Sequence, residues 1–324
     1  MKISVALCTY NGEKYLEEQL NSYLDQTFQP SEIIACDDGS VDKTLEILEN
    51  FKIRSVIPVH IYRNTTRLGF TKNFEKAISL CNGDFIALSD QDDVWLPDKA
   101  ETLVNEFNKP ENENVNVIFT DMALVDSDLK SLNKTVWKSF EFFKVIMSEL
   151  NKKGYFKLLK ERGNFVAGAS TMMRKKIVNK LIPFVDGAKN WYHDGQIALI
   201  AAKNNELRYL DKPLVLYRQH EGQTVSIEEY HQPPILSDIL KGIIEVKKNN
   251  LFYFDKVNTI KILEKDERKR LVKEILFLEK RVSILGKKII KRIIPVTVQF
   301  FALNYLRFNG KRFIRTAISD FLNH

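Results

Sequence analysis

Apolar residues alternate between two patterns along roughly the first hundred positions of this 324-residue chain. One is a short continuous apolar run, which predicts a buried strand of a parallel sheet. The other is a set of apolar residues three and four positions apart, which predicts a helix with one buried face. Predicted strands cover residues 3–8, 32–36, 59–62 and 85–89, and predicted helices cover residues 15–24, 45–51 and 70–81. Repeated strand–helix units predict an α/β fold with a mostly parallel sheet flanked by helices.

Each of the four predicted strands ends at polar side chains. In open parallel sheets, ligands bind in the crevice beyond the carboxyl ends of the strands. Four neighbouring strand ends with polar groups therefore predict a binding site at that edge. The polar residues at these ends are Thr9, Asp37, Asp38, Asn64, Asp90 and Asp92.

The fourth strand runs directly into three carboxylates, Asp90, Asp92 and Asp93. Like charges crowded together repel, and removing them from water costs free energy. A divalent cation relieves that conflict, and hard oxygen ligands suit Mg²⁺ or Mn²⁺. The alternative is a solvated acidic turn, because Asp is common in turns.

Size and composition are those of a globular protein, with 44% hydrophobic and 28% charged residues. The three cysteines lie in or beside apolar runs, which predicts free buried thiols in a reducing compartment. Met1 and Lys2 lead straight into the first strand, and no apolar run approaches the ~20 residues of a membrane span. We therefore expect a cytoplasmic protein.

The net charge of +7 is divided unevenly. Residues 1–240 hold 29 Lys and Arg against 34 Asp and Glu, whereas residues 241–324 hold 20 against 8. The sign changes near the dipeptide Pro233–Pro234, which also interrupts regular structure. We predict one domain over residues 1–232 and a basic, mainly helical C-terminal extension over residues 233–324.

Six segments in order over about two hundred residues resemble the family 2 glycosyltransferases, in particular the rhamnosyltransferase-like branch that builds bacterial surface polysaccharides. The resemblance implies the GT-A (Rossmann-like) nucleotide-sugar-binding fold and transfer of a sugar from a nucleotide-sugar donor. The tail after residue 235 lies outside this resemblance. The matching segments are Val5–Asn11, Asp37–Ser40, Asn64 with Leu68–Gly69, Leu88–Trp95 with Pro97, Tyr192–Asp194 and Leu216–His220.

The resemblance also implies roles for individual residues on the donor side. Asp38 would accept a hydrogen bond from the base, and a carboxylate facing the N3–H of uracil or thymine favours a UDP- or dTDP-sugar. Asp90 would face the ribose, and Asp92 would bind Mn²⁺ or Mg²⁺ between the phosphates. Further nucleotide- or sugar-binding candidates are Thr9, Tyr10, Asn11, Asn64 and Gly168. Asp93 has a second interpretation as a cap of the helix after Pro97.

Asp194 is the candidate general base, which would take the proton of the acceptor hydroxyl while the anomeric centre inverts. Without the resemblance, an Asp just before a helix is most simply an N-cap. His193 stands where family members often have Glu, so its role stays open. His220 follows an apolar run and is a candidate metal ligand, with a purely structural role as the alternative. Arg218 could pair with a phosphate or be solvated.

Gly168 lies in the small-residue segment Gly163–Ala169, which resembles the family's loop beside the donor sugar. Its alternative interpretation is a tight turn into a strand over residues 170–173.

The C-terminal extension has helical spacing over residues 235–292, and residues 284–318 interleave large apolar side chains with Lys and Arg. A cationic helix with an aromatic face suits an anionic membrane surface, which would place the protein peripherally at the inner face of the cell membrane. A helical cap on the core is the alternative. Nucleic acid ranks last as a partner, because no recognised binding motif is present.

Two other functions remain open from the sequence. Asp90–Val94 also fits the nucleophile motif of haloacid-dehalogenase-like phosphatases, with Asp90 as the nucleophile. A non-catalytic, membrane-associated partner subunit is the second alternative. The preferred partners are a nucleotide-sugar donor and a glycan or lipid-linked acceptor.

Overall fold

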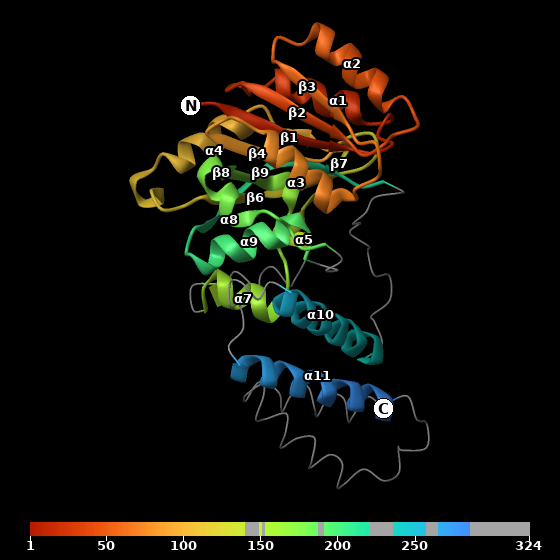
Figure 1. Ribbon diagram of the computed structural model, residues 1–324, viewed down its shortest axis with the longest axis vertical. Coiled ribbons are helices and arrows are strands. Elements are labelled where there is room, and N and C mark those ends of the chain that lie inside the picture. The colour runs from red at the N-terminus through yellow and green to blue at the C-terminus, as the bar shows by residue number, and fades with distance from the viewer. Residues whose placement is uncertain (140–148, 151–152, 187–190, 221–235, 257–264, 286–324) are drawn as a thin grey trace. The chain divides into compact units, whose positions relative to one another are not determined.

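The chain divides into two compact units, Met1–Glu229 and Tyr230–His324, in the computed structural model shown in Figure 1. The predicted domain boundary after residue 232 lies outside the described residues. The structure describes residues 1–139, 149–150, 153–186, 191–220, 236–256 and 265–285.

One mixed sheet forms the centre of the first unit, and its strands follow the order β3-β2-β1-β4-β8-β6-β9-β5, with β7 paired to β6. The strands are β1 (Ile3–Thr9), β2 (Glu32–Asp37), β3 (Val59–Arg63), β4 (Phe85–Ser89), β5 (Val94–Trp95), β6 (Val117–Val125), β7 (Ser131–Thr135), β8 (Thr171–Arg174) and β9 (Leu207–Arg218).

The first four strands pair in parallel, as the sequence pattern predicts. The other half of the sheet is mixed: β8 is antiparallel to both β4 and β6, β5 is antiparallel to β9, and β6 and β9 are parallel. The repeated strand–helix pattern ends after β4, so nothing in it predicts these reversals of direction.

Helices cover the sheet, and the three predicted in the first hundred residues are present. Side chains at alternate positions of β1 pack with Leu16, Leu20 and Leu48 of the first two helices, and burying one such leucine contributes about 1.5–3 kcal/mol. The helices of the first unit are α1 (Leu16–Leu24), α2 (Thr44–Arg54), α3 (Phe70–Leu80), α4 (Lys99–Phe107), α5 (Val136–Ser139), α7 (Tyr155–Arg162), α8 (Val178–Leu181), α9 (His193–Lys203) and the short 3₁₀ helices η1 (Pro110–Asn112), η2 (Gly168–Ser170) and η3 (Lys175–Ile177).

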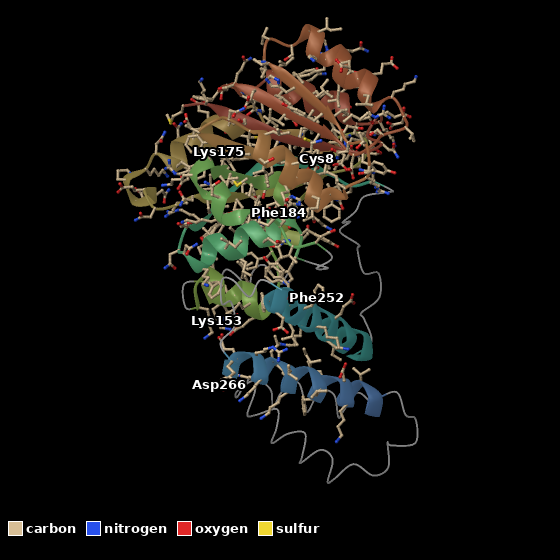
Figure 2. All side chains as sticks on the ribbon, viewed as in Figure 1. Cys8, Lys153, Lys175, Phe184, Phe252 and Asp266 are labelled. Carbon is tan, nitrogen blue, oxygen red and sulfur yellow. The ribbon has the colours of Figure 1, made fainter. Side chains whose placement is uncertain are left out.

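Two of these helices, α3 and α9, pack against each other and carry residues of the candidate site. α3 lies on β1 and β2, whereas α9 lies on β6 and β9, and Figure 1 shows both beside the sheet. Cys8, labelled in Figure 2, is on β1, and like Cys36 and Cys81 it is free and buried, as predicted.

The second unit contains α10 (Leu236–Lys256) and α11 (Lys265–Leu285), which pack together around Ile244, Ile275 and Leu278. The prediction of a helical extension is therefore confirmed for Leu236–Lys256 and Lys265–Leu285. The predicted cationic and aromatic segment lies outside the described residues from 286 onward. Within the ranges described above, none of the helices combines the length and the apolar content that a membrane span requires.

Candidate functional site

The carboxyl ends of β3, β2, β1 and β4 lie side by side. Thr9 at the end of β1 is in register with Asp37 at the end of β2, and Asp37 is in register with Arg63 of β3. On the other side, Leu7 is in register with Ser89, so the acidic turn that begins at Asp90 follows the neighbouring strand. The topology thus brings the polar strand ends to one edge of the sheet.

Asp37 organises the first acidic turn from within. Its carboxylate accepts hydrogen bonds from the main-chain N–H groups of Gly39 at 3.1 Å and Ser40 at 2.9 Å. The hydroxyl groups of Thr9, at 3.0 Å, and Ser40 also donate to it. Gly39 has a φ of 87°, a conformation that other residues adopt only with strain. Thr9 is buried, and its hydroxyl stabilises this turn through its hydrogen bond to Asp37.

Asp38 is 4% exposed, and its carboxylate holds the segment that precedes α3. It accepts hydrogen bonds from Leu68 N at 2.7 Å, Gly69 N at 2.9 Å and Asn64 Nδ2 at 2.8 Å. Asn64 also donates to Asn73 and accepts from Lys76, so its amide is occupied by protein partners. A carboxylate has about four acceptor positions, which leaves Asp38 one for a ligand.

Tyr10 is tied to the second acidic turn through Gln91, a residue that the sequence did not single out. The amide of Gln91 accepts from Tyr10 N at 2.8 Å and donates to Tyr10 O at 3.0 Å. The Tyr10 ring is partly exposed and lies 4.0 Å from the guanidinium of Arg67. Asn11 accepts a hydrogen bond from Val41 N, which connects the end of β1 to the segment after the first acidic turn.

The carboxylates of the second acidic turn, residues 90–93, have far fewer hydrogen-bond donors than those of the first turn. Burial raises the pKa of Asp90 to about 7, and the nearby carboxylates of Asp92 and Asp194 add to the shift. Burial, followed by Asp92 and Asp90, also holds the pKa of Asp93 well above its usual range.

Asp93 does not cap the following helix, so that interpretation is wrong. The residue before α4 is Asp98, whereas Asp93 is 1% exposed and accepts a hydrogen bond from Arg218 N at 3.3 Å. Its other carboxylate oxygen, Oδ2, has no partner among the described residues.

Asp92 and His220 meet, although they are far apart in the sequence. His220 Nε2 lies 3.1 Å from Asp92 Oδ2, and both side chains are partly exposed. A carboxylate and an imidazole are suitable donors for Mn²⁺ or Mg²⁺. In the part of the chain that the structure describes, no three His, Cys, Asp or Glu side chains are placed to hold a metal by themselves. Mg²⁺ is often held by one or two carboxylates plus substrate phosphates, so the pair fits a site that the substrate completes.

Asp194 lies in the first turn of α9, and Tyr192, not Asp194, is the N-cap residue. Its carboxylate accepts hydrogen bonds from Gly195 N at 2.6 Å and Asn164 Nδ2 at 3.2 Å. Burial raises the pKa of Asp194 to about 6, although these bonds and one from Gly168 N oppose the shift. The Asp194 carboxylate also interacts electrostatically with Asp90, which places it near the Asp90–Asp93 turn. Its pKa of about 6 means that it ionises close to neutral pH.

His193 is buried and stacks on Phe74, with ring centroids 3.9 Å apart. Burial lowers the pKa of His193 to about 3, so the ring is neutral, and neither ring nitrogen has a partner among the described residues. A Cβ at Gly168 would lie 2.7 Å from His193 Nε2. Gly168 is thus required for the close approach of η2 to α9.

Two cationic residues lie buried behind the acids, and the sequence did not predict their burial. Lys99 of α4 is fully buried and donates to Ala169 O at 2.7 Å, and burial lowers its pKa to about 7. Arg218 is also fully buried, so it is not solvated as suggested, and its guanidinium has protein partners in place of a phosphate. Neither residue has a local sequence signal, because charged residues on helices and strands usually face water.

Comparison with known proteins agrees with this arrangement. The sequence model described as glycosyl transferase family 2 matches residues 4–182. The dTDP-rhamnosyl transferase RfbG of Shigella flexneri is 31% identical over 231 residues, which cover 68% of this chain and 73% of that protein.

Two solved structures share the fold. Staphylococcus aureus TarS 1–349 in complex with UDP-GlcNAc superposes with a TM-score of 0.54 at 19% identity, over 86% of this chain and 72% of that one. The mannosyltransferase PcManGT of Pyrobaculum calidifontis, in complex with GDP-Man and Mn²⁺, has a TM-score of 0.50 at 14% identity, over 99% and 87% of the two chains. These likenesses confirm the predicted GT-A fold.

Proposed function

The chain belongs to family 2 of the glycosyltransferases, and from this premise we propose that it transfers a sugar from a UDP- or dTDP-sugar to an acceptor hydroxyl with inversion at the anomeric carbon. The observation that carries the proposal is the approach of His220 Nε2 to Asp92 Oδ2 at 3.1 Å, beside the half-buried Asp90. Membership of this family removes the support for the phosphatase. The intact acidic residues Asp38, Asp90 and Asp92 argue against a non-catalytic partner subunit.

Asp92 and His220 would hold the divalent cation, Mn²⁺ or Mg²⁺. When bound with the donor diphosphate, the cation stabilises the charge of the departing nucleoside diphosphate. The Mn²⁺ bound by PcManGT, which has the same fold, supports this part of the proposal. Asp93, the next residue after Asp92, is buried and interacts electrostatically with the buried Lys99.

The nucleotide would lie across the ends of β1, β2 and β3. Tyr10 and Asn11 would line it, Asp38 would use its remaining acceptor position for the base, and Asp90 would face the ribose. Thr9 and Asn64 act here through the carboxylates that they hydrogen-bond. A carboxylate can accept the N3–H of uracil or thymine, which favours a pyrimidine donor.

Asp194 would act as the general base. Its pKa of about 6 lets it be ionised at neutral pH and still accept a proton from a hydroxyl group as that oxygen attacks. Asn164 and Gly195 orient the carboxylate, and Gly168 allows η2 to approach it. Attack on the face opposite the leaving group inverts the anomeric configuration.

Calorimetric titration with UDP, dTDP, GDP and ADP, each with and without Mn²⁺, tests the donor side. We expect UDP or dTDP to bind most tightly and only with Mn²⁺. Binding of GDP as the tightest ligand would overturn the assignment of Asp38, and equal binding in EDTA would overturn the metal site.

For the acceptor, we propose a lipid-linked or glycan hydroxyl in bacterial surface polysaccharide synthesis, on the strength of the dTDP-rhamnosyl transferase relative. Residues 241–324 carry 20 Lys and Arg against 8 Asp and Glu. Each basic residue near an anionic membrane contributes about 1 kcal/mol, so this extension could hold the enzyme at the inner face of the membrane.

Vesicle flotation compares the full chain with a variant that stops after Gln232. We expect the full chain to float with anionic vesicles and to be released by salt, because exposed charges are screened over about 8–10 Å. If both proteins float equally, the extension has no role in membrane attachment.

A further inference from the structure

The buried guanidinium of Arg218 lies behind the acidic turn and joins four parts of the first unit. Arg218 ends β9, Glu18 is on α1, and Ser127 is in the turn between β6 and β7. The fourth part is the 90–93 turn, which contains Asp92. Such a group is expensive to bury unless its donors are satisfied, so its placement calls for a reason.

Each side of the Arg218 guanidinium has a partner. Arg218 Nε donates to the main-chain carbonyl of Asp92 at 2.9 Å, and Nη1 donates to Ser127 O at 2.5 Å. Nη2 pairs with the carboxylate of Glu18, which is half exposed. The main-chain N–H of Arg218 donates to Asp93. The acidic turn is therefore held at two consecutive residues by one arginine.

The same guanidinium is linked to His220 through one aromatic ring. Its Cζ lies 4.3 Å from the centroid of the Tyr15 ring, and this ring lies 4.6 Å from the ring of His220. The chain also passes from Arg218 to His220 in two residues. Arg218 thus contacts the main chain of one candidate metal ligand and, through Tyr15, supports the side chain of the other.

From these contacts we infer that Arg218 is a positioning residue, which fixes the 90–93 turn and His220 at the separation needed to bind a divalent cation. The part that concerns the cation rests on the proposed function. The part that concerns the turn does not, because the contacts exist without any ligand. Lysine cannot replace the guanidinium, since one ammonium group cannot reach three partners in a fixed planar arrangement.

Arg174 offers a matched control. It also donates to two main-chain carbonyls, of Val115 at 3.0 Å and Phe107 at 2.6 Å, and it lies over the rings of Phe85 and Phe107. These partners lie at the end of α4, just before β6 and at the start of β4, and not in the acidic turn. Arg174→Lys should therefore lower the melting temperature without affecting the candidate site.

The first measurement is hydrogen exchange of the metal-free full-length protein, followed in peptides that cover residues 88–96. We expect faster exchange there in Arg218→Lys than in the native protein, and no change in Arg174→Lys. Glu18→Gln keeps the arginine and removes only its half-exposed partner, so it should show a smaller increase and remains informative if Arg218→Lys does not fold. Unchanged exchange in both Arg218→Lys and Glu18→Gln would overturn the inference.

The second measurement is Mn²⁺ binding in the presence of UDP, by titration calorimetry. Outer residues that orient metal ligands typically change metal affinity by about 10- to 100-fold, and we expect Arg218→Lys to weaken Mn²⁺ binding by that amount. Arg174→Lys should bind as the native protein does. If the native protein binds no Mn²⁺, the proposed metal site fails, and the exchange experiment still decides the role of Arg218.

Discussion

Two acidic turns follow the strands on either side of β1, and their carboxylates have opposite surroundings. In the turn after β2, Asp37 and Asp38 accept hydrogen bonds from main-chain N–H groups, hydroxyls and an amide. In the turn after β4, Asp93 has an oxygen without a partner among the described residues, and the pKa of Asp90 rises to about 7. Both segments look like acidic turns in the sequence. They differ in the number of hydrogen-bond donors that surround their carboxylates.

The difference separates carboxylates that hydrogen bonds hold in place from carboxylates that have few such partners. A buried carboxylate with several donors stabilises its surroundings, because the ionised form is compensated. A carboxylate near other carboxylates, with few donors, costs free energy when it ionises. A cation or a proton would remove that cost, which agrees with the metal site that we propose at the turn after β4.

The sharpest way to test the comparison is Asp194→Asn, since the Asp194 carboxylate adds to the negative charge that acts on Asp90. Transfer should fall by about 10²–10⁴-fold, the usual contribution of a general base, while donor affinity and the melting temperature stay the same or rise. Initial rates and UDP titration separate the two effects. Near-native turnover would remove Asp194 from the mechanism.

Asp92→Asn should have the next largest effect. Loss of a metal ligand should reduce transfer by roughly 10²–10³-fold, because the cation contributes several kcal/mol to transition-state stabilisation. The metal-free fold should not suffer, since a charge that raises the pKa of both Asp90 and Asp93 is removed. Rates with added Mn²⁺, together with a melting curve in EDTA, measure both; full activity would contradict the assignment.

Asp37→Asn should behave in the opposite way. The amide nitrogen cannot accept the hydrogen bonds that Thr9 and Ser40 donate, and leaving buried donors unsatisfied costs about 1–3 kcal/mol. For a unit of this size each kcal/mol lowers the melting temperature by about 2–4 °C. We expect a fall of several degrees by calorimetry. A variant as stable as the native protein would show that the two turns do not differ as argued.

The sequence predicted the half of the fold in which each strand is followed by its own helix. It also predicted that the polar strand ends would meet, because the ends of parallel strands share one edge. It could not predict the other half, where β5 has two residues and Val94 pairs with Leu216. Such pairing depends on contacts between distant segments, which leave no local pattern.

The same limit applies to the candidate site. The three acids of the second turn stand out, whereas Lys99 and Arg218 behind them look like ordinary surface residues. Their burial follows from the completed fold, because each contacts segments more than sixty residues away. The Asp38 carboxylate likewise accepts hydrogen bonds from Leu68 N and Gly69 N, and the sequence of the acidic turn gives no sign of these partners.

The smallest effect we predict is in the pH dependence of transfer, and it distinguishes the two groups of acids without a mutation. Burial raises the pKa of Asp194 to about 6, and a general base acts in its ionised form. The rate at saturating donor should therefore rise with pH. At about pH 6 it should be half of its plateau value, which is a twofold reduction. Below that pH it should fall about tenfold per unit. We expect the fold to stay the same between pH 5 and 7. Circular dichroism over the same pH range measures the folded fraction. If the rate falls in parallel with that fraction, the pH profile reflects stability and not the general base.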